Sequence, residues 1–279
     1  MFKTIIVHVD DSPAFDSRLR AAAWLAGEYG AHLVGSAATG LSWPAYALLS
    51  GSMAVVPVDE FDQMRTRARS NLARFAEQAR LLGVRSIEER LIEDEHRDAL
   101  LLQSRYADLV VTSQEGGTAP AAGPSRVRGL PQYLVLHGPR PVLVVPPSYA
   151  GEPIAQSILI GWDGNGPALR AIDAALPLLQ RALSVRLAVI NPGRETRLHG
   201  DEPGADMALY LARHGVTVEV TNEHTAASAG DALLALARDS QAGLLVTGAF
   251  GHSRFREIVL GGVTRVLLER AMLPVLLAH

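Results

Sequence analysis

The chain repeats its own pattern, and this repeat limits the folds open to it more than any other feature. A short apolar run that ends in an acid occurs at 4–12 (TIIVHVDDS) and again at 157–165 (SILIGWDGN), an offset of 153 residues. Near the end of each half, PVLVV at 141–145 recurs as PVLLA at 274–278, an offset of 133. Self-similarity of this kind indicates two copies of one structural unit.

Each copy has the pattern of alternating strands and helices. The strands are short, continuous apolar runs such as 244–247, which is typical of parallel strands buried on both faces. Between them lie amphipathic runs; Leu169, Ile172, Leu176 and Leu179, for example, fall at helical spacing. The sequence therefore predicts an α/β protein of two doubly wound domains, each with a five-stranded, mostly parallel sheet and helices on both faces.

The two copies differ in length and are separated by a turn-rich stretch. The Pro/Gly-rich segment PPSYAGEP at 146–153 predicts a boundary between a first domain at 1–147 and a second at 154–279. The fall of the offset from 153 to 133 places about 20 extra residues in the first half, at 40–60. We expect this insert to be a loop or lid.

Composition excludes several classes of chemistry. The chain has no Cys, so disulfide frameworks and thiolate catalysis are excluded, and Lys3 is its one lysine, which argues against a P-loop or a Schiff base. A net charge of -3 gives no general attraction to nucleic acid. The histidines lack metal-site spacing, and no apolar run approaches the ~18 residues of a membrane span. We expect a cytoplasmic protein without a structural metal or a membrane partner.

The most informative stretch is TGAFGHSRFREIVLGGVT, which follows an apolar strand and leads into an amphipathic run. Gly248 and Gly251 stand at the carboxyl end of the strand, where backbone without side chains can approach a ligand closely. Gly261 and Gly262 stand at the start of the next helix, whose free N–H groups favour phosphate, and Thr264 adds a hydroxyl group. This arrangement predicts a phosphate-binding site.

The spacing G-x2-G-x9-G from Gly248 to Gly261 resembles that of the universal stress protein family, whose ATP-binding members carry it before a small hydroxyl residue. The resemblance extends over both halves of the chain. It implies an ATP site in the second domain, and a nucleotide can bring Mg²⁺ with it. It also implies that Asp163 lies beside the nucleoside and that the backbone of Val189 faces the base.

The resemblance assigns the glycine-rich stretch to the ribose and phosphates. It places Gly248 and Gly251 in the loop over these groups, and Gly261, Gly262 and Val263 in the helix start that holds phosphate. The family usually has Ser or Thr where this chain has Gly262, so one hydroxyl contact worth about 1 kcal/mol is missing. Thr264 is expected to compensate in part.

Structural explanations compete for these same residues. Glycines at strand-to-helix turns often serve only to form the turn. Asp163 fits a cap for the following helix as well as a nucleoside contact, and Val189 fits a core position.

The first half departs from the pattern. Ser113 and Gly116 stand at the positions of the paired glycines, Arg128 and Gly129 at the helix start, and Pro131 at the position of Thr264. An Arg side chain and a residue without N–H are poorly suited to a phosphate-binding backbone. We expect this half to be degenerate for ATP.

The favoured function is that of a cytoplasmic tandem universal stress protein that binds ATP in its second domain and acts in the stress response as a nucleotide-dependent regulatory or protective protein. One alternative is a nucleotide-free dimerisation scaffold, and another is a slow ATPase or nucleotide-dependent transferase. No motif supplies a catalytic base, so at most slow ATP hydrolysis or autophosphorylation is expected. The resemblance also implies that 141–145 pairs with 274–278, with a homodimer and a regulatory protein partner as further interactions.

Overall fold

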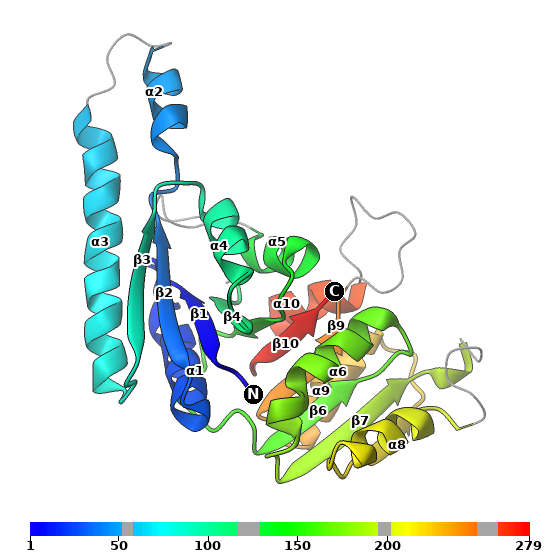
Figure 1. Ribbon diagram of the computed structural model, residues 1–279. Coiled ribbons are helices and arrows are strands. Elements are labelled where there is room, and N and C mark those ends of the chain that lie inside the picture. The colour runs from blue at the N-terminus through cyan, green and yellow to red at the C-terminus, as the bar shows by residue number, and fades with distance from the viewer. Residues whose placement is uncertain (52–57, 116–128, 195–201, 250–261) are drawn as a thin grey trace. The chain divides into compact units, whose positions relative to one another are not determined.

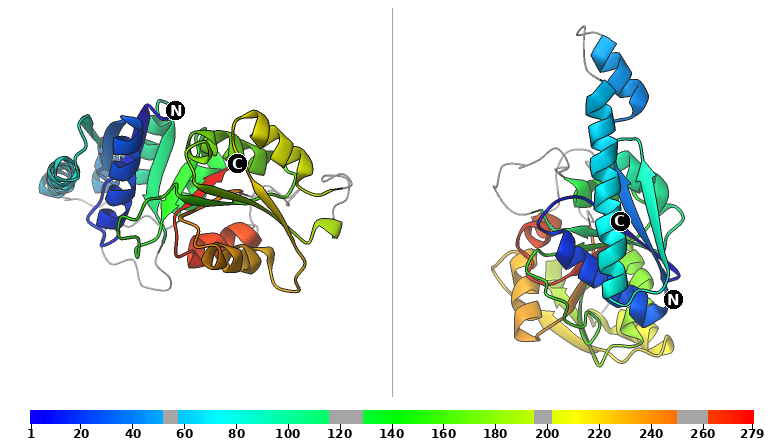
Figure 2. Two further views of the ribbon diagram at one scale, coloured as in Figure 1. Left: turned by 90° about the horizontal axis from the view of Figure 1, so that it is seen from below. Right: turned by 90° about the vertical axis from the view of Figure 1, so that its left-hand side faces the viewer.

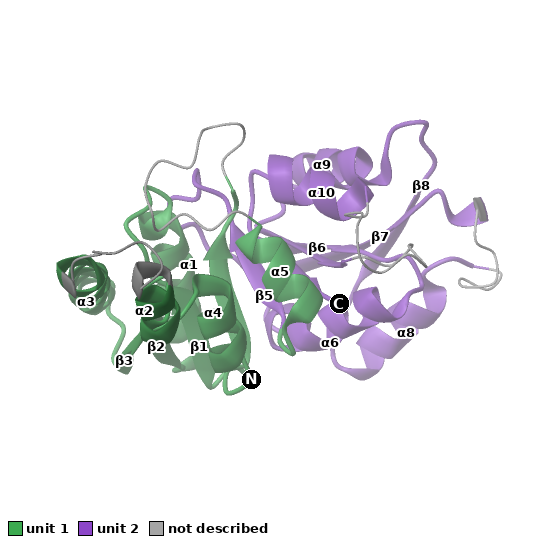
Figure 3. Ribbon diagram, turned by 90° about the horizontal axis from the view of Figure 1, so that it is seen from above, with its two compact units in different colours: residues 1–140 green, residues 141–279 purple. Residues whose placement is uncertain are grey.

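The protein divides into two compact units, residues 1–140 and 141–279 (Figure 3). In this computed structural model the described residues are 1–51, 58–115, 129–194, 202–249 and 262–279. Strands and helices alternate along the chain in both units (Figure 1).

The first unit has four strands: β1 (Thr4–His8), β2 (His32–Ala38), β3 (Ile87–Ile92) and β4 (Leu109–Ser113). Its helices are α1 (Phe15–Tyr29), α2 (Trp43–Gly51), α3 (Val58–Leu81), α4 (His96–Ser104) and α5 (Leu130–His137). The second unit contains the strands β5 (Val142–Val145), β6 (Ser157–Gly161), β7 (Ser184–Ile190), β8 (Glu219–Glu223), β9 (Leu244–Gly248) and β10 (Val275–Ala278). Its helices are α6 (Gly166–Leu179), α8 (Ala205–Arg213), α9 (Ala229–Asp239) and α10 (Gly262–Arg270), with a short 3₁₀ turn at Pro192–Arg194.

In the first unit the strands run parallel in the order β3-β2-β1-β4. Residues of β1 such as Ile5 and Ile6 are fully buried, because helices cover both faces of the sheet. Helix α1 packs with α3, and α4 packs with α5. This is the doubly wound arrangement that the continuous apolar runs predict.

Among the described residues, the second unit repeats this plan and has two further strands, β10 and β5. Its order is β5-β10-β9-β6-β7-β8, and β6 to β10 are mutually parallel. Helices α6 and α8 cover one face of this sheet, and α9 and α10 cover the other (Figure 2). Strand β5 pairs antiparallel with β10, with Val144 opposite Val275. The predicted pairing of 141–145 with 274–278 is therefore confirmed.

This pairing also determines where the two units divide. Strand β5 ends the first repeat in sequence, but it belongs to the second unit, where it pairs with β10. The division lies at 140/141, before the turn-rich stretch at 146–153. The domain limits 1–147 and 154–279 stay a prediction drawn from the repeat.

The insert at 40–60 is not a plain loop, which corrects the prediction. Its residues 43–51 form α2, and its last residues belong to the first turn of α3. The sequence WPAYALLS favours a helix, since Pro is tolerated in the first turn and Ala and Leu are strong helix formers. Trp43, Tyr46 and Phe61 pack as an aromatic cluster with ring centroids 5.1 to 5.8 Å apart, which anchors α2 to α3.

A glycine in β2 allows α3 to lie close to the sheet. A Cβ placed on Gly35 would be 2.4 Å from the ring of Phe75, which is fully buried. Contacts this short do not occur in folded proteins, so Gly35 is required by the packing of α3 and not by a backbone conformation.

We predict opposite effects for two Gly→Ala substitutions in the first unit. Gly35→Ala should destabilise the protein by about 1–3 kcal/mol, because the added methyl group overlaps the Phe75 ring. Gly27→Ala, in the interior of α1 with open space around it, should raise stability by up to about 1 kcal/mol. Urea unfolding of the full chain measures both, and a harmless Gly35→Ala would show that the packing is looser than described.

Candidate functional site

The residues predicted to contact the nucleoside lie at one edge of the second sheet. Strand β6 lies between β7 and β9, and all three are parallel, so their carboxyl ends share this edge. Asp163 follows β6, Val189 lies near the end of β7, and Gly248 is the last residue of β9. The connection that follows β6 leads to β7 on one side, whereas the connection that follows β8 leads to β9 on the other side of β6. Open α/β sheets form a ligand crevice where the strand order reverses in this way.

Gly248 has a packing reason of its own. A Cβ at this position would lie 2.3 Å from the backbone N of Ala168 and 2.6 Å from the carbonyl carbon of Pro167. The end of β9 therefore touches the first turn of α6 directly, and only glycine permits this contact. The structural explanation for Gly248 holds whether or not a ligand binds beside it.

Asp163 holds the turn that leads into α6. Its Oδ1 accepts a hydrogen bond from the backbone N of Asn165 at 3.0 Å, and its Oδ2 accepts one from Asn165 Nδ2 at 3.3 Å. This is an Asx turn, which stabilises the chain just before the helix. The side chain is half-buried, so the carboxylate also keeps access to the edge of the sheet.

The side chain of Val189 is part of the core: it is 1% exposed and lies beside Gly204.

Asn191, two positions further along the chain, was not predicted from the sequence. Asn191 has φ 52, its Nδ2 donates to Thr225 O, and the Thr225 amide donates to its Oδ1, both at 3.0 Å. Asn tolerates this left-handed backbone, and the two hydrogen bonds fix the segment after β8 to the end of β7.

The helix start predicted to hold phosphate is present in part. Gly262, Val263 and Thr264 form the first turn of α10, with Thr264 buried and Gly262 exposed. A Cβ on Gly262 would meet no atom within 4 Å, so this position has room for a side chain. Gly251 and Gly261 lie outside the described residues.

The corresponding edge of the first unit is filled by a buried charged cluster. The Arg18 side chain, 1% exposed, donates from Nε to His8 O at 2.7 Å and from Nη1 to Ser113 Oγ at 2.8 Å. Its Nη2 forms a salt bridge with Asp10. The acid at the end of the first strand, which has Asp163 as its counterpart, is therefore bound by a side chain of the protein itself.

A carboxylate also takes the helix start of the first unit. The backbone N of Leu130 in α5 donates to Glu115 Oε1 at 3.0 Å. Gly129 precedes this helix with φ 71, and Pro131 in its first turn has no N–H to offer. Ser113 binds Arg18, and Gly116 and Arg128 lie outside the described residues. The described part of this helix start thus holds an anion supplied by its own chain.

The two units differ systematically at these edges. Where the first unit has polar side chains, the second has glycine or alanine. The corresponding residues, matched by strand register and helix start, are His8 and Gly161, Arg18 and Ala171, Ser36 and Ala188, His96 and Ala229, and Ser113 and Gly248. At these matched positions the second unit has no long side chain to cover the strand ends.

Burial determines the charges of the cluster in the first unit. It lowers the pKa of His8 to about 3, although Asp10 opposes this, and it lowers the pKa of His96 as well. Burial alone would raise the pKa of Asp10, but Arg18 and His8 hold it well below its usual range. At neutral pH the cluster therefore contains two neutral imidazoles and one Arg–Asp ion pair.

Two kinds of site are not found in the part of the chain that the structure describes. There, no group of three or more His, Asp or Glu side chains is placed to hold a metal ion. No helix in that part is both long and apolar enough to cross a membrane.

Comparison with known families gives a match to both halves. The model of the universal stress protein family matches residues 1–146 and 155–279. A universal stress protein of Synechocystis is 25% identical over 171 residues, which is 61% of this chain and 57% of that protein. The chain thus covers little more than half the length of this curated relative.

Solved structures agree on the fold. A universal stress protein from Archaeoglobus fulgidus has a TM-score of 0.71 at 14% identity, over 99% of this chain and 97% of that chain. A Pseudomonas aeruginosa protein has a TM-score of 0.61 at 17% identity, over 99% and 93% of the two chains. At these identities the likeness concerns the fold alone.

We predict that Arg18→Met destabilises the protein by about 3–5 kcal/mol, because Asp10 is left buried with an uncompensated charge. The double variant Asp10→Asn/Arg18→Met should recover part of this loss, since it buries no charge. Urea unfolding of the full chain measures both. Equal stability of the single and double variants would contradict a dominant role for the ion pair.

Stability should also depend on pH through His8 and His96. Unfolded histidine has a pKa near 6.5 and the folded pKa of His8 is about 3, so between these values only the unfolded state binds the proton. Stability from burying the neutral ring is complete above pH 6.5 and falls below it, by up to about 1.4 kcal/mol per pH unit. The urea concentration at the midpoint of unfolding should therefore decrease when the pH is lowered from about 7.5 to about 5.5.

A variant with glutamine at position 8, His8→Gln, should reduce this pH dependence. The control is His224→Gln, at an exposed position in the second unit. An unchanged slope in His8→Gln would show that other groups carry the effect.

Proposed function

The chain belongs to the universal stress protein family, with two copies of the family domain in tandem, and from this premise we propose that its second unit binds ATP. The nucleotide lies at the carboxyl ends of β6, β7 and β9. The protein acts in the cytoplasm as a nucleotide-dependent regulatory or protective protein of the stress response. The first unit binds no nucleotide in the same manner.

The contrast between the two sheet edges is the observation that carries this proposal. In the first unit Arg18 covers the strand ends and Glu115 holds the α5 helix start. In the second unit Ala171 replaces Arg18, and the first turn of α10 opens on free space at Gly262. A large anionic ligand would meet small residues and a helix start in the second unit, whereas in the first the protein supplies the charges itself.

Each predicted residue has a role in the proposed complex. Asp163 and the backbone of Val189 contact the nucleoside, and the first turn of α10, Gly262 to Thr264, binds phosphate. Gly248, Gly251 and Gly261 let the intervening chain approach the ribose and phosphates. Mg²⁺ accompanies ATP and is held mainly by the phosphates, since Mg²⁺ sites commonly combine few carboxylates with substrate phosphate and water.

Binding, and not turnover, is the proposed mode of action. A ligand that binds only the folded state stabilises it by RT ln(1 + [L]/Kd), about 2.7 kcal/mol at a hundredfold excess over Kd. ATP would in this way stabilise the second unit and alter the surface that a protein partner meets. Slow hydrolysis or autophosphorylation is compatible with this mode, and turnover above about 1 per second would instead indicate an ordinary enzyme.

The proposal is tested by identifying what the purified protein carries. The protein is denatured, released small molecules are identified by mass spectrometry, and Mg-ATP is titrated calorimetrically into the stripped full chain. One adenine nucleotide per chain supports the proposal, and two would show that the first unit also binds. No nucleotide and no heat would favour the nucleotide-free dimerisation scaffold.

We predict that Gly262→Ser strengthens ATP binding about fivefold, because a hydroxyl group adds a hydrogen bond worth about 1 kcal/mol. The substitution should not disturb the fold, since a side chain at this position meets no atom within 4 Å. The matched control is Gly193→Ser, in the same unit and also with open space around it. Calorimetry with Mg-ATP gives the affinities, and equal changes in both variants would contradict a phosphate site at α10.

A further inference from the structure

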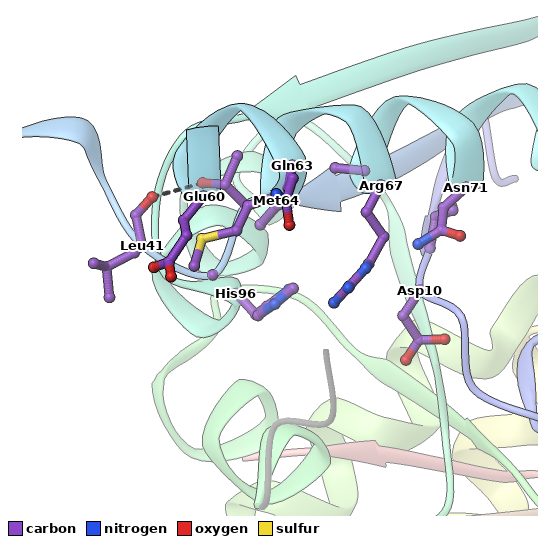
Figure 4. A pocket seen from close by; sticks show the side chains of 13 residues that line it. Asp10, Leu41, Glu60, Gln63, Met64, Arg67, Asn71 and His96 are labelled. Carbon is purple, nitrogen blue, oxygen red and sulfur yellow. Dashed lines mark hydrogen bonds between the residues drawn. The ribbon is translucent and has the colours of Figure 1, made fainter. Parts of the chain in front are cut away.

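The first unit contains a pocket of its own, about 310 Å³ in volume, at the carboxyl ends of β1 and β2. We call it the Arg67 pocket; its lining includes Asp10, Leu41, Gln63, Met64, Arg67 and His96 (Figure 4). Helix α3 forms one wall, and the ends of the strands and the first residue of α4 form the rest. Its volume is at the low end of small-molecule sites.

Arg67 is the one cationic side chain of α3 that lines the pocket, and it points into it (Figure 4). The neighbouring arginines of α3 are used elsewhere. Arg65 pairs with Asp62 and Glu93, and Arg74 donates to Asp10 O at 2.7 Å. No hydrogen bond, ion pair or ring contact of Arg67 occurs within the described part of the chain, so no described group neutralises its guanidinium group.

Two further polar side chains that line the pocket, Asp10 and His96, offer no net charge to Arg67. The charge of Asp10 is taken by Arg18, so this carboxylate does not compete for Arg67. His96, 6% exposed, lines the pocket with a ring that burial keeps neutral, and its Nδ1 has no partner in the described structure. A neutral imidazole with an unmet hydrogen-bonding atom is costly unless a ligand or water completes it.

The chemistry of the wall selects a single negative charge. One guanidinium group matches one planar carboxylate through two parallel hydrogen bonds. Glu60 also lines the pocket and would repel a polyanion, while Val9, Ala38, Leu41 and Met64 provide apolar surface for a carbon skeleton. A nucleoside triphosphate carries several negative charges, which this lining with one Arg and one Glu does not match, and the α5 helix start is held by Glu115.

We infer that the first unit binds a compact organic acid with one carboxylate group, in the Arg67 pocket. The carboxylate lies on Arg67, the carbon skeleton lies against the apolar wall, and a polar group of the ligand meets His96. This site does not depend on the ATP site proposed for the second unit. The protein would then respond to two ligands of different chemistry, one in each unit.

The test uses two pairs of probes that differ in charge but little in shape: benzoate with benzamide, and isobutyrate with isobutyramide. Saturation-transfer NMR on the full chain detects weak binding of each. At least one acid should bind about tenfold more tightly than its amide, as expected for a hydrogen-bonded charge pair. Absence of transfer from both acids at about 10 mM, where even weak ligands are detected, would overturn the inference.

Variants locate the site. Arg67→Gln should weaken binding of the acid about tenfold, while Arg80→Gln, an exposed position at the far end of the same helix, should leave it within about twofold. An equal effect of both variants, or none from Arg67→Gln, would place the acid elsewhere and overturn the inference.

Competition separates this site from the nucleotide site. Excess Mg-ATP should not displace the acid. Displacement that persists in Gly262→Arg, which places a large side chain at the α10 helix start where a Cβ would meet no atom within 4 Å, would show that the Arg67 pocket is itself a nucleotide site and would refute an organic-acid site. Failure of ATP to bind anywhere would refute the proposed function and leave the organic-acid site standing.

Discussion

Parallel pairing of the strands is the constraint on which both sites depend. Because β1, β2 and β4, and likewise β6, β7 and β9, run in the same direction, their carboxyl ends open onto one edge of each sheet. Whatever side chains follow those strands must meet there. The same architecture therefore gives two edges, and the chemistry of each is decided by a few residues: Arg18 and His96 in the first unit, Ala171 and Ala229 in the second.

The fold could be predicted from the sequence because its signals are local and repeated. Apolar runs such as 244–247 mark buried parallel strands, and the offset between the halves indicates two copies of one unit. The insert at 40–60 was harder to predict: Trp43 and Tyr46 lie in a short apolar segment, and their helical state depends on Phe61, which comes later in the chain. Strand order alone could not show that β5 is grouped with the second unit.

The candidate sites could be predicted in part. The acid after each first strand and the small residues at 248 and 262 can be found by pattern. In the second unit, Asp163 follows β6, Gly248 ends β9, and Gly262 begins α10. Gly248 carries a second constraint, contact with α6, that spacing cannot reveal. The periodicity of the sequence does not predict the salt bridge of Arg18 with Asp10. Nor does it predict that Arg67, on α3, lines a pocket with Asp10 and His96.

Strand β5 links the two repeats in a way that affects how the chain can be divided. It is coded by the first repeat, yet it pairs antiparallel with β10 of the second. A fragment that begins after 153 would present β10 as a bare edge of four apolar residues, VLLA, with unpaired N–H and C=O groups. Such an edge recruits another strand, so the isolated second repeat would self-associate. Because both repeats are in one polypeptide, β5 covers the edge of β10 and limits such self-association.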